Sequence, residues 1–179
     1  HGFRESYMLR YMLDNETKGS PSLLDIDAFD DPFSYRLLIG TGTVGETKSV
    51  TIDLVETFNY LIGLRVRHTN TIQGFRIVDG INPRGERVLV IWRKIRDLDN
   101  EDPVEVERQR DEANVALDTF FKKQQYNTLD TEYDVIFVNG DNNLMNLPLT
   151  PGTSDVEPHY KVRLIEEEFK LLMFDVKDV

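Results

Sequence analysis

The chain has 179 residues, of which 40% are hydrophobic and 30% charged, and these values predict one soluble domain with a sizeable core rather than a disordered or fibrous protein. It contains no cysteine, which excludes a disulfide scaffold and a cysteine-ligated metal site and favours a cytoplasmic location. The net charge of −11 argues against a primary grip on nucleic acid, because phosphate binding draws its affinity from Lys and Arg.

No apolar run approaches the roughly 20 residues that a membrane-spanning helix needs, and no signal sequence opens the chain. We therefore expect no membrane partner. The first two residues, His1-Gly2, are unusual for a native start. Two explanations stay open: the pair was added to the natural sequence, or the chain was cut from a longer protein.

The N-terminal third of the chain predicts an arm followed by a hairpin. The arm, Phe3–Leu13, has a helical pattern and is followed by a polar break at Asn15–Ser22. Two short apolar runs with β-branched residues come next, Tyr35–Gly40 and Ser49–Ile52, separated by a glycine-rich turn. Such a pair is typical of a β-hairpin.

A short helix is predicted directly after this hairpin. Asp53 and Glu56 have the spacing of a capping box, in which a side chain satisfies a free backbone N–H of the first turn. Phe58 and Leu61 provide an apolar stripe, and Gly63 ends the helix because glycine readily adopts a left-handed conformation.

Three strands follow in the prediction, at Leu64–Asn70, Gly74–Asp79 and Arg87–Ile95. Asn82-Pro83-Arg84-Gly85 forms a strong turn signal between the last two strands, so we expect an antiparallel meander. From Pro103 to Tyr126 the apolar period becomes helical, with proline suited to the first turn. The apolar positions of this helix include Val115, Phe120 and Phe121.

The C-terminal part completes the predicted fold. Tyr133–Val138 is a compact strand, so the chain from Arg87 onward has the order strand, helix, strand, which predicts a right-handed crossover between parallel strands. Asn139–Pro158 is a turn-rich loop, and a closing helix follows. Its apolar positions are Ile165, Phe169, Leu172 and Met173. The predicted fold class is a single α/β domain with a mixed sheet flanked by helices.

A glycine-rich segment imitates a dinucleotide-binding loop. Gly40, Gly42 and Gly45 belong to GTGTVG, directly after a predicted strand. Such a loop needs a helix N-terminus immediately after it to receive the pyrophosphate. The residues that follow lead instead into the β-rich run Ser49–Ile52, which favours a hairpin. A self-contained nucleotide-binding domain that uses this loop stays open as an alternative function.

The segment DPFSY, Asp31–Tyr35, imitates the Asp-Pro-Pro-Tyr loop of amino-group methyltransferases. The second proline is missing and one residue is inserted, so neither the backbone geometry nor the position of the aromatic ring is reproduced. The segment also runs directly into the next strand. We predict a turn and the start of a strand here.

A nuclease-like pattern is also incomplete. Asp79 and Lys94 lie on successive predicted strands, as the acid and the lysine of a metal-dependent nuclease do. Trp92, however, takes the place of the second carboxylate, and an indole cannot bind Mg²⁺. Trp92 is therefore predicted to pack in the core.

The remaining titratable residues give no catalytic pattern. His1, His68 and His159 lack the spacing of metal ligands. The three consecutive glutamates Glu166–Glu168 point around a helix axis rather than toward one point. A solvated helix face is the prediction for them.

Positive charge gathers on the predicted meander. The candidate DNA contacts are Arg65, Arg67, Arg76 and Arg84. A solvated sheet face, balanced by the acidic helix that follows, is the favoured interpretation of these residues. A DNA-contacting accessory module stays open as the alternative.

Several segments resemble, in the same order, the C-terminal region of type III-like site-specific DNA methyltransferases, the Mod subunits. The segments are ETFNYLIGLRV at Glu56–Val66, VLVIWRK at Val88–Lys94, DVIFVNGDNNL at Asp134–Leu144 and IEEEFKLLMF at Ile165–Phe174. YMLDNETKGSPSLLD at Tyr11–Asp25, followed by PFSYRL, is similar to the stretch that succeeds the catalytic core in this family. The likeness covers nearly the whole chain, although each segment is a packing pattern without chemistry of its own.

The resemblance implies a parent enzyme that transfers a methyl group from S-adenosylmethionine to adenine N6 in DNA, after flipping the base from the duplex. It also implies a restriction-modification or phage-defence setting, with Mod dimers and a helicase-nuclease restriction subunit as partner. The family's Asp-Pro-Pro-Tyr and Phe-x-Gly-x-Gly motifs have no match here, so no catalytic or cofactor-binding residue carries over. Residues 1–179 are therefore predicted to be a non-catalytic C-terminal domain, and residues 1–34 an arm from an upstream catalytic core.

Overall fold

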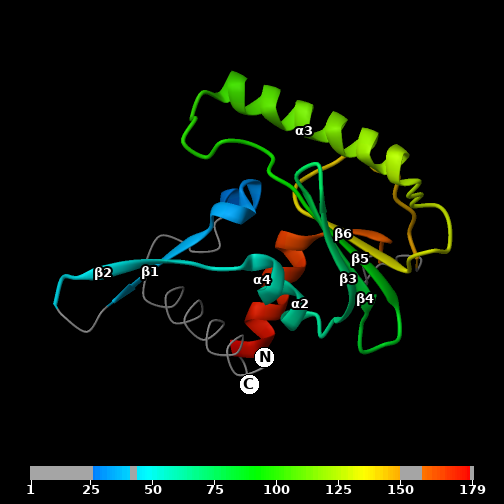
Figure 1. The fold of residues 1–179 in the computed structure, drawn as a ribbon, viewed down its shortest axis with the longest axis horizontal. Coiled ribbons are helices and arrows are strands. Elements are labelled where there is room, and N and C mark those ends of the chain that lie inside the picture. The colour runs from blue at the N-terminus through cyan, green and yellow to red at the C-terminus, as the bar shows by residue number, and fades with distance from the viewer. Residues whose placement is uncertain (1–25, 41–43, 150–158, 178–179) are drawn as a thin grey trace, which may run out of the picture.

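A five-stranded mixed sheet organises the chain in the computed structural model (Figure 1), which describes residues 26–40, 44–149 and 159–177. In their order across the sheet, the strands are β3 (Arg65–Ile72), β4 (Phe75–Ile81), β5 (Arg87–Trp92), β6 (Val135–Val138) and β7 (Val162–Leu164). Strands β3, β4 and β5 are antiparallel neighbours, and β5, β6 and β7 are parallel neighbours. The predicted α/β class, the meander and the parallel pairing of the crossover strands are thus confirmed.

The other elements surround this sheet. They are the 3₁₀ helices η1 (Ile26–Asp30) and η2 (Pro32–Ser34), the strands β1 (Arg36–Gly40) and β2 (Thr47–Thr51), and the helices α2 (Leu54–Leu61), α3 (Pro103–Gln124) and α4 (Ile165–Lys177). Figure 1 shows α3 across one side of the sheet, with α2 and α4 on the other. Strands β1 and β2 form the predicted hairpin, which extends away from the sheet. The helix predicted at Phe3–Leu13 lies outside the described residues.

Local signals set the helix ends as predicted. The Asp53 Oδ1 atom accepts a hydrogen bond of 3.1 Å from the Glu56 backbone N–H, so the N-terminal cap of α2 is formed. Gly63 has a φ of 63°, the left-handed conformation that ends this helix without the strain a Cβ atom would bring. Asp102 caps α3 in the same way, with Pro103 in its first turn.

The core between the sheet and helices α2 and α4 centres on Phe58. Its ring centroid lies 5.9 Å from that of Trp92, 5.2 Å from that of Phe137 and 6.1 Å from that of Phe169. Phe29 of η1 stacks on Trp92 in the same cluster. All five rings are at most 4% exposed, so the prediction that Trp92 packs in the core is confirmed.

Helix α3 covers the opposite face of the sheet. Phe120 and Phe121 are buried there, as predicted, together with Leu117. Val115 lies on the outer side of the helix and is 64% exposed, so this apolar residue is not part of the core. Strand β7 is not predicted from the sequence, because a strand of three residues is too short to show an alternating pattern.

Replacing Phe58 tests how far the fold depends on this cluster. We expect Phe58→Ala to lower the free energy of unfolding by about 3–5 kcal/mol, because it removes a fully buried ring and leaves a cavity. Tyr60→Ala on the same helix removes a ring that is 42% exposed and is the matched control. Urea unfolding monitored by circular dichroism measures both, and equal losses for the two variants would contradict the central role of Phe58.

Candidate functional site

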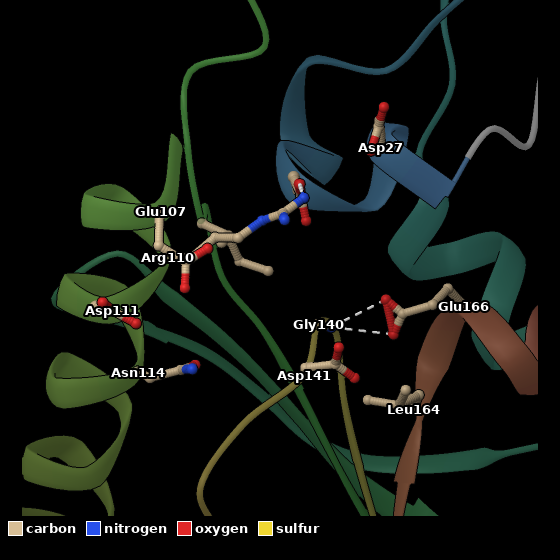
Figure 2. Close-up of a pocket in the computed structure, with 11 residues that line it drawn as sticks. Asp27, Glu107, Arg110, Asp111, Asn114, Gly140, Asp141, Leu164 and Glu166 are labelled. Carbon is tan, nitrogen blue, oxygen red and sulfur yellow. Dashed lines mark hydrogen bonds and ion pairs between the residues drawn. The ribbon is translucent and has the colours of Figure 1, made fainter. Parts of the chain in front are cut away.

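A cavity of about 280 Å³ lies at the carboxyl ends of the parallel strands, where α/β proteins commonly bind ligands. Its lining comes from η1, α3 and the segments that follow β5, β6 and β7, as Figure 2 shows. The residues that line it are Asp27, Asp30, Ile95, Glu107, Arg110, Asp111, Asn114, Gly140, Asp141, Leu164 and Glu166. Carboxylates dominate this set, so the partners of each buried charge decide what the cavity can do.

Arg93, directly after β5, is the buried cation behind the cavity, with 3% of its surface exposed. Its Nε atom donates to the Asn139 carbonyl oxygen at 3.1 Å, and its Nη1 atom to the Asn114 Oδ1 atom at 2.9 Å. Further bonds reach the carbonyl oxygens of Ala113, Gly140 and Asp141. Burial lowers the pKa of Arg93 to about 10, with Glu166 the first of the acids that oppose this shift.

Asn139 continues the pairing of β5 and β6 beyond the ends of these strands. Its Oδ1 atom accepts from the Arg93 backbone N–H at 3.0 Å, and its Nδ2 atom donates to the Arg93 carbonyl oxygen at 2.8 Å. The same Nδ2 atom donates to the Phe29 carbonyl oxygen at 2.7 Å. A fully buried side chain therefore ties η1 to the end of the sheet.

Asp30, the residue after Phe29, fixes the same end of η1. Its carboxylate accepts from the Arg96 Nε atom at 2.7 Å and from the Arg110 Nη2 atom at 3.2 Å. Its carbonyl oxygen accepts from the Ile95 backbone N–H at 2.7 Å. The 3₁₀ helix is thus joined to the segment after β5 and to α3.

Glu166, in the first turn of α4, corrects the prediction of a solvated face for the three glutamates. It is 3% exposed, and both carboxylate oxygens accept from the Gly140 backbone N–H at 3.0 Å. Burial raises its pKa to about 7, and the nearby Asp30 and Asp141 add to this shift. The prediction is wrong for this residue because β7 and the loop after β6 enclose the start of α4, whereas Glu167 is exposed as predicted.

The Gly140 backbone makes this contact possible. Its φ of 83° is a conformation that favours glycine, and a Cβ atom here would collide with the Ile95 side chain. The loop after β6 can therefore contact both α4 and the segment after β5.

The two most buried carboxylates of the cavity, Asp30 and Glu166, both have partners within the protein. Across the described ranges, no group of three or more His, Asp or Glu side chains is placed to hold a metal ion. Asp30 is engaged by two arginines, and Glu166 by a backbone N–H. The polar groups with the deepest burial thus hold elements together.

The four candidate DNA contacts lie on the antiparallel side of the sheet, remote from the cavity's lining. Arg65 and Arg67 belong to the edge strand β3 and are exposed. Arg84 is exposed in the turn after β4, whereas Arg76, near the start of β4, is half-buried and donates to the Thr71 hydroxyl at 3.1 Å. Register places Arg65 opposite Ile81 and Arg76 opposite Thr71, so these two arginines lie toward opposite ends of the strand pair.

The imitated catalytic motifs are structural where they are described. Gly40 pairs with Thr47 in the β1–β2 hairpin, and a strand rather than a helix follows the glycine-rich turn, as predicted. Gly42 lies outside the described residues. Asp79 bonds His68, with 2.9 Å between its Oδ1 atom and the Nδ1 atom of the ring.

Comparison with known proteins gives no relative from which a function could be transferred. No family model, no curated protein and no solved structure matches the chain. None of the described helices combines the length and the apolar character needed to cross a membrane.

The burial of Glu166 predicts a pH dependence of stability. Its folded pKa of about 7 lies above the ordinary value of 4.5, so the folded state holds a proton that the unfolded chain has already released. The stabilisation is complete below about pH 4.5 and is lost as the pH rises through 7, a change of about 3 kcal/mol at most. Glu105 and Asp134 have lowered pKa values because of hydrogen bonds from Arg108 and Arg87, so they act at more acidic pH.

Urea unfolding between about pH 5 and 8 measures this loss, the window following from the two pKa values. Glu166→Gln keeps an acceptor for the Gly140 N–H but cannot ionise, so we expect a flatter profile and higher stability than the parent chain at the alkaline end. Parallel profiles for the two proteins would disprove the assignment to Glu166.

The Asn139 bridge gives a second prediction. Asn139→Ala leaves the Arg93 N–H and two carbonyl oxygens without their buried partner, so we expect a loss of about 3 kcal/mol or more in unfolding free energy. Asn127→Ala is the matched control, since its exposed side chain accepts one bond, from the Leu129 backbone N–H. Thermal unfolding compares the two, and a loss below about 1 kcal/mol at Asn139 would refute the bridging role.

Proposed function

We propose that this chain is a non-catalytic C-terminal domain of a site-specific DNA methyltransferase that modifies adenine N6, in a restriction-modification or phage-defence system. The parent enzyme takes its methyl group from S-adenosylmethionine, which an upstream core binds. The tasks proposed for the domain are to support that core, to dimerise, and to dock a helicase-nuclease restriction subunit.

The observation that carries this proposal is the meeting of the family-like segments around Phe58. Phe58 comes from ETFNYLIGLRV, and its three ring partners come from the other three segments: Trp92 from VLVIWRK, Phe137 from DVIFVNGDNNL and Phe169 from IEEEFKLLMF. Each segment alone is an ordinary packing pattern. Their convergence on one ring supports the proposal, because it makes the four segments parts of one packed scaffold.

The polar network favours a structural role for the domain over a catalytic one. The hydrogen bonds of Asn139 and Asp30 connect η1 to the ends of β5 and β6 and to α3. Phe29, between them, is fully buried against Trp92 and Phe169. Phe29 and Asp30 are therefore fixed against the domain, which supports a role in positioning an upstream core.

The proposal predicts that the isolated chain is inactive. Calorimetric titration with S-adenosylmethionine is expected to show no binding heat, and assays with adenine-containing duplex DNA are expected to show no methyl transfer, because the chain has neither an Asp-Pro-Pro-Tyr nor a Phe-x-Gly-x-Gly motif. Measurable turnover by the chain alone would refute the proposal.

A second test examines the natural gene. The reading frame upstream of His1 is expected to encode Asp-Pro-Pro-Tyr followed much later by Phe-x-Gly-x-Gly. In that parent enzyme, Phe58→Ala is expected to disturb assembly in sedimentation velocity while leaving S-adenosylmethionine affinity unchanged, and Tyr60→Ala is expected to disturb neither. A natural start codon near His1 would count decisively against the proposal.

A further inference from the structure

Four arginines on β3, on β4 and in the turn after β4 have no carboxylate partner among the described residues. They are Arg65, Arg67, Arg76 and Arg84. By contrast, Arg87, Arg96, Arg108 and Arg110 each pair with an aspartate or glutamate. The chain has 32 acidic and 21 basic residues, so acidic partners outnumber the bases. Arginines without a carboxylate partner on one strand pair and its turn therefore need an explanation.

The local fold brings three of these arginines together at one end of β3. Arg65 opens the strand opposite Ile81, and the turn that follows Ile81 carries Arg84. This turn packs against the residue before β3: a Cβ atom on Gly63 would lie 2.8 Å from the Pro83 Cγ atom. The start of the edge strand and the turn therefore form one surface.

A β-bulge sets the position of Arg67. The register shifts between Val66 and His68, which leaves Arg67 without a residue opposite it on β4. Gly80 permits this close approach, because a Cβ atom there would overlap the Arg65 carbonyl oxygen. The bulge thus places Arg67 on the edge strand close to Arg65.

The same features disfavour a protein strand as the occupant of this edge. Bulges and charged side chains are the means by which edge strands avoid pairing with another chain. All but one of the residues of β3 are exposed, and three neighbours in its middle, Thr69, Asn70 and Thr71, carry hydroxyl or amide groups. Such groups, with arginine, are the ones that contact phosphate oxygens.

We propose that this surface, the arginine edge formed by Arg65, Arg67 and Arg84, binds the phosphate backbone of duplex DNA. Arg76 lies at the other end of the strand pair and, five residues from Ile81 on β4, on the other face of the sheet, so it is not part of this surface. β3 has eight residues and a length of about 26 Å, which matches roughly seven phosphates along one strand. Binding of single strands relies on exposed aromatic platforms, and the aromatic residue of the strand pair, Phe75, is buried at 9% exposure.

Fluorescence anisotropy with the full 179-residue chain and a labelled duplex of arbitrary sequence tests this proposal. Three phosphate contacts predict that the logarithm of the association constant falls with the logarithm of salt concentration at a slope of about −2.7. Each of Arg65→Gln, Arg67→Gln and Arg84→Gln is expected to reduce that slope by about 0.9 and to weaken binding roughly tenfold at about 50 mM salt.

Arg108→Gln is the matched control. It removes the same charge from an exposed arginine on α3, whose partners are Glu105 and Glu112, and binding is expected to stay within about twofold of the parent chain. Equal losses at Arg108 and at the arginine edge would overturn the proposal, as would absence of binding at low salt. Competition by poly-glutamate as strong as that by unlabelled duplex would assign the edge to an acidic protein instead. None of these outcomes bears on the inactivity expected of the isolated chain, so the two proposals fail separately.

Discussion

The buried charge of Arg93 is the constraint on which the rest of the structure depends. A guanidinium that is 3% exposed is costly to remove from water, so each donor needs an acceptor. The acceptors come from α3, through Ala113 and Asn114, and from the loop after β6, through Asn139 and its successors. One side chain thereby joins the middle of the crossover helix to the ends of the two parallel strands.

This constraint explains why the carboxyl ends of the strands resemble a catalytic centre. Fold position alone marks this edge as a ligand site, and a carboxyl group with a pKa near neutrality adds to that impression. The partners lead to a different conclusion. Glu166 accepts from the Gly140 N–H and Asp30 pairs with two arginines, so these two acids join segments that are distant in sequence. The raised pKa of Glu166 follows first from its burial in this fold.

Much of the fold could be predicted from the sequence, because its signals are local. Asp53 and Gly63 mark the ends of α2, the Asn82–Gly85 turn separates β4 from β5, and the change of period after Pro103 marks α3. Burial of Glu166 could not be predicted, because three adjacent glutamates look alike until the loop after β6 is placed on the first one. Asn139-Gly140 directly after an apolar strand was the available signal for the network. Its partners lie 46 and 110 residues away, at Arg93 and Phe29, beyond any local pattern.

The two populations of arginine divide the molecule into a scaffold and a candidate interface. At the carboxyl ends of the strands, Arg96 and Arg110 pair with Asp30, and Arg93 donates to backbone carbonyls and to Asn114. Arg93 and Arg96 are buried, and burial makes a charge without partners costly. Arg65 and Arg67 lie on an exposed edge, where water solvates a free guanidinium and retaining it costs little. Because a phosphate contact is strongest when no internal carboxylate competes for the donor, the pairing at one end of the sheet and its absence at the other are consistent with a rigid domain whose recognition surface is the edge strand.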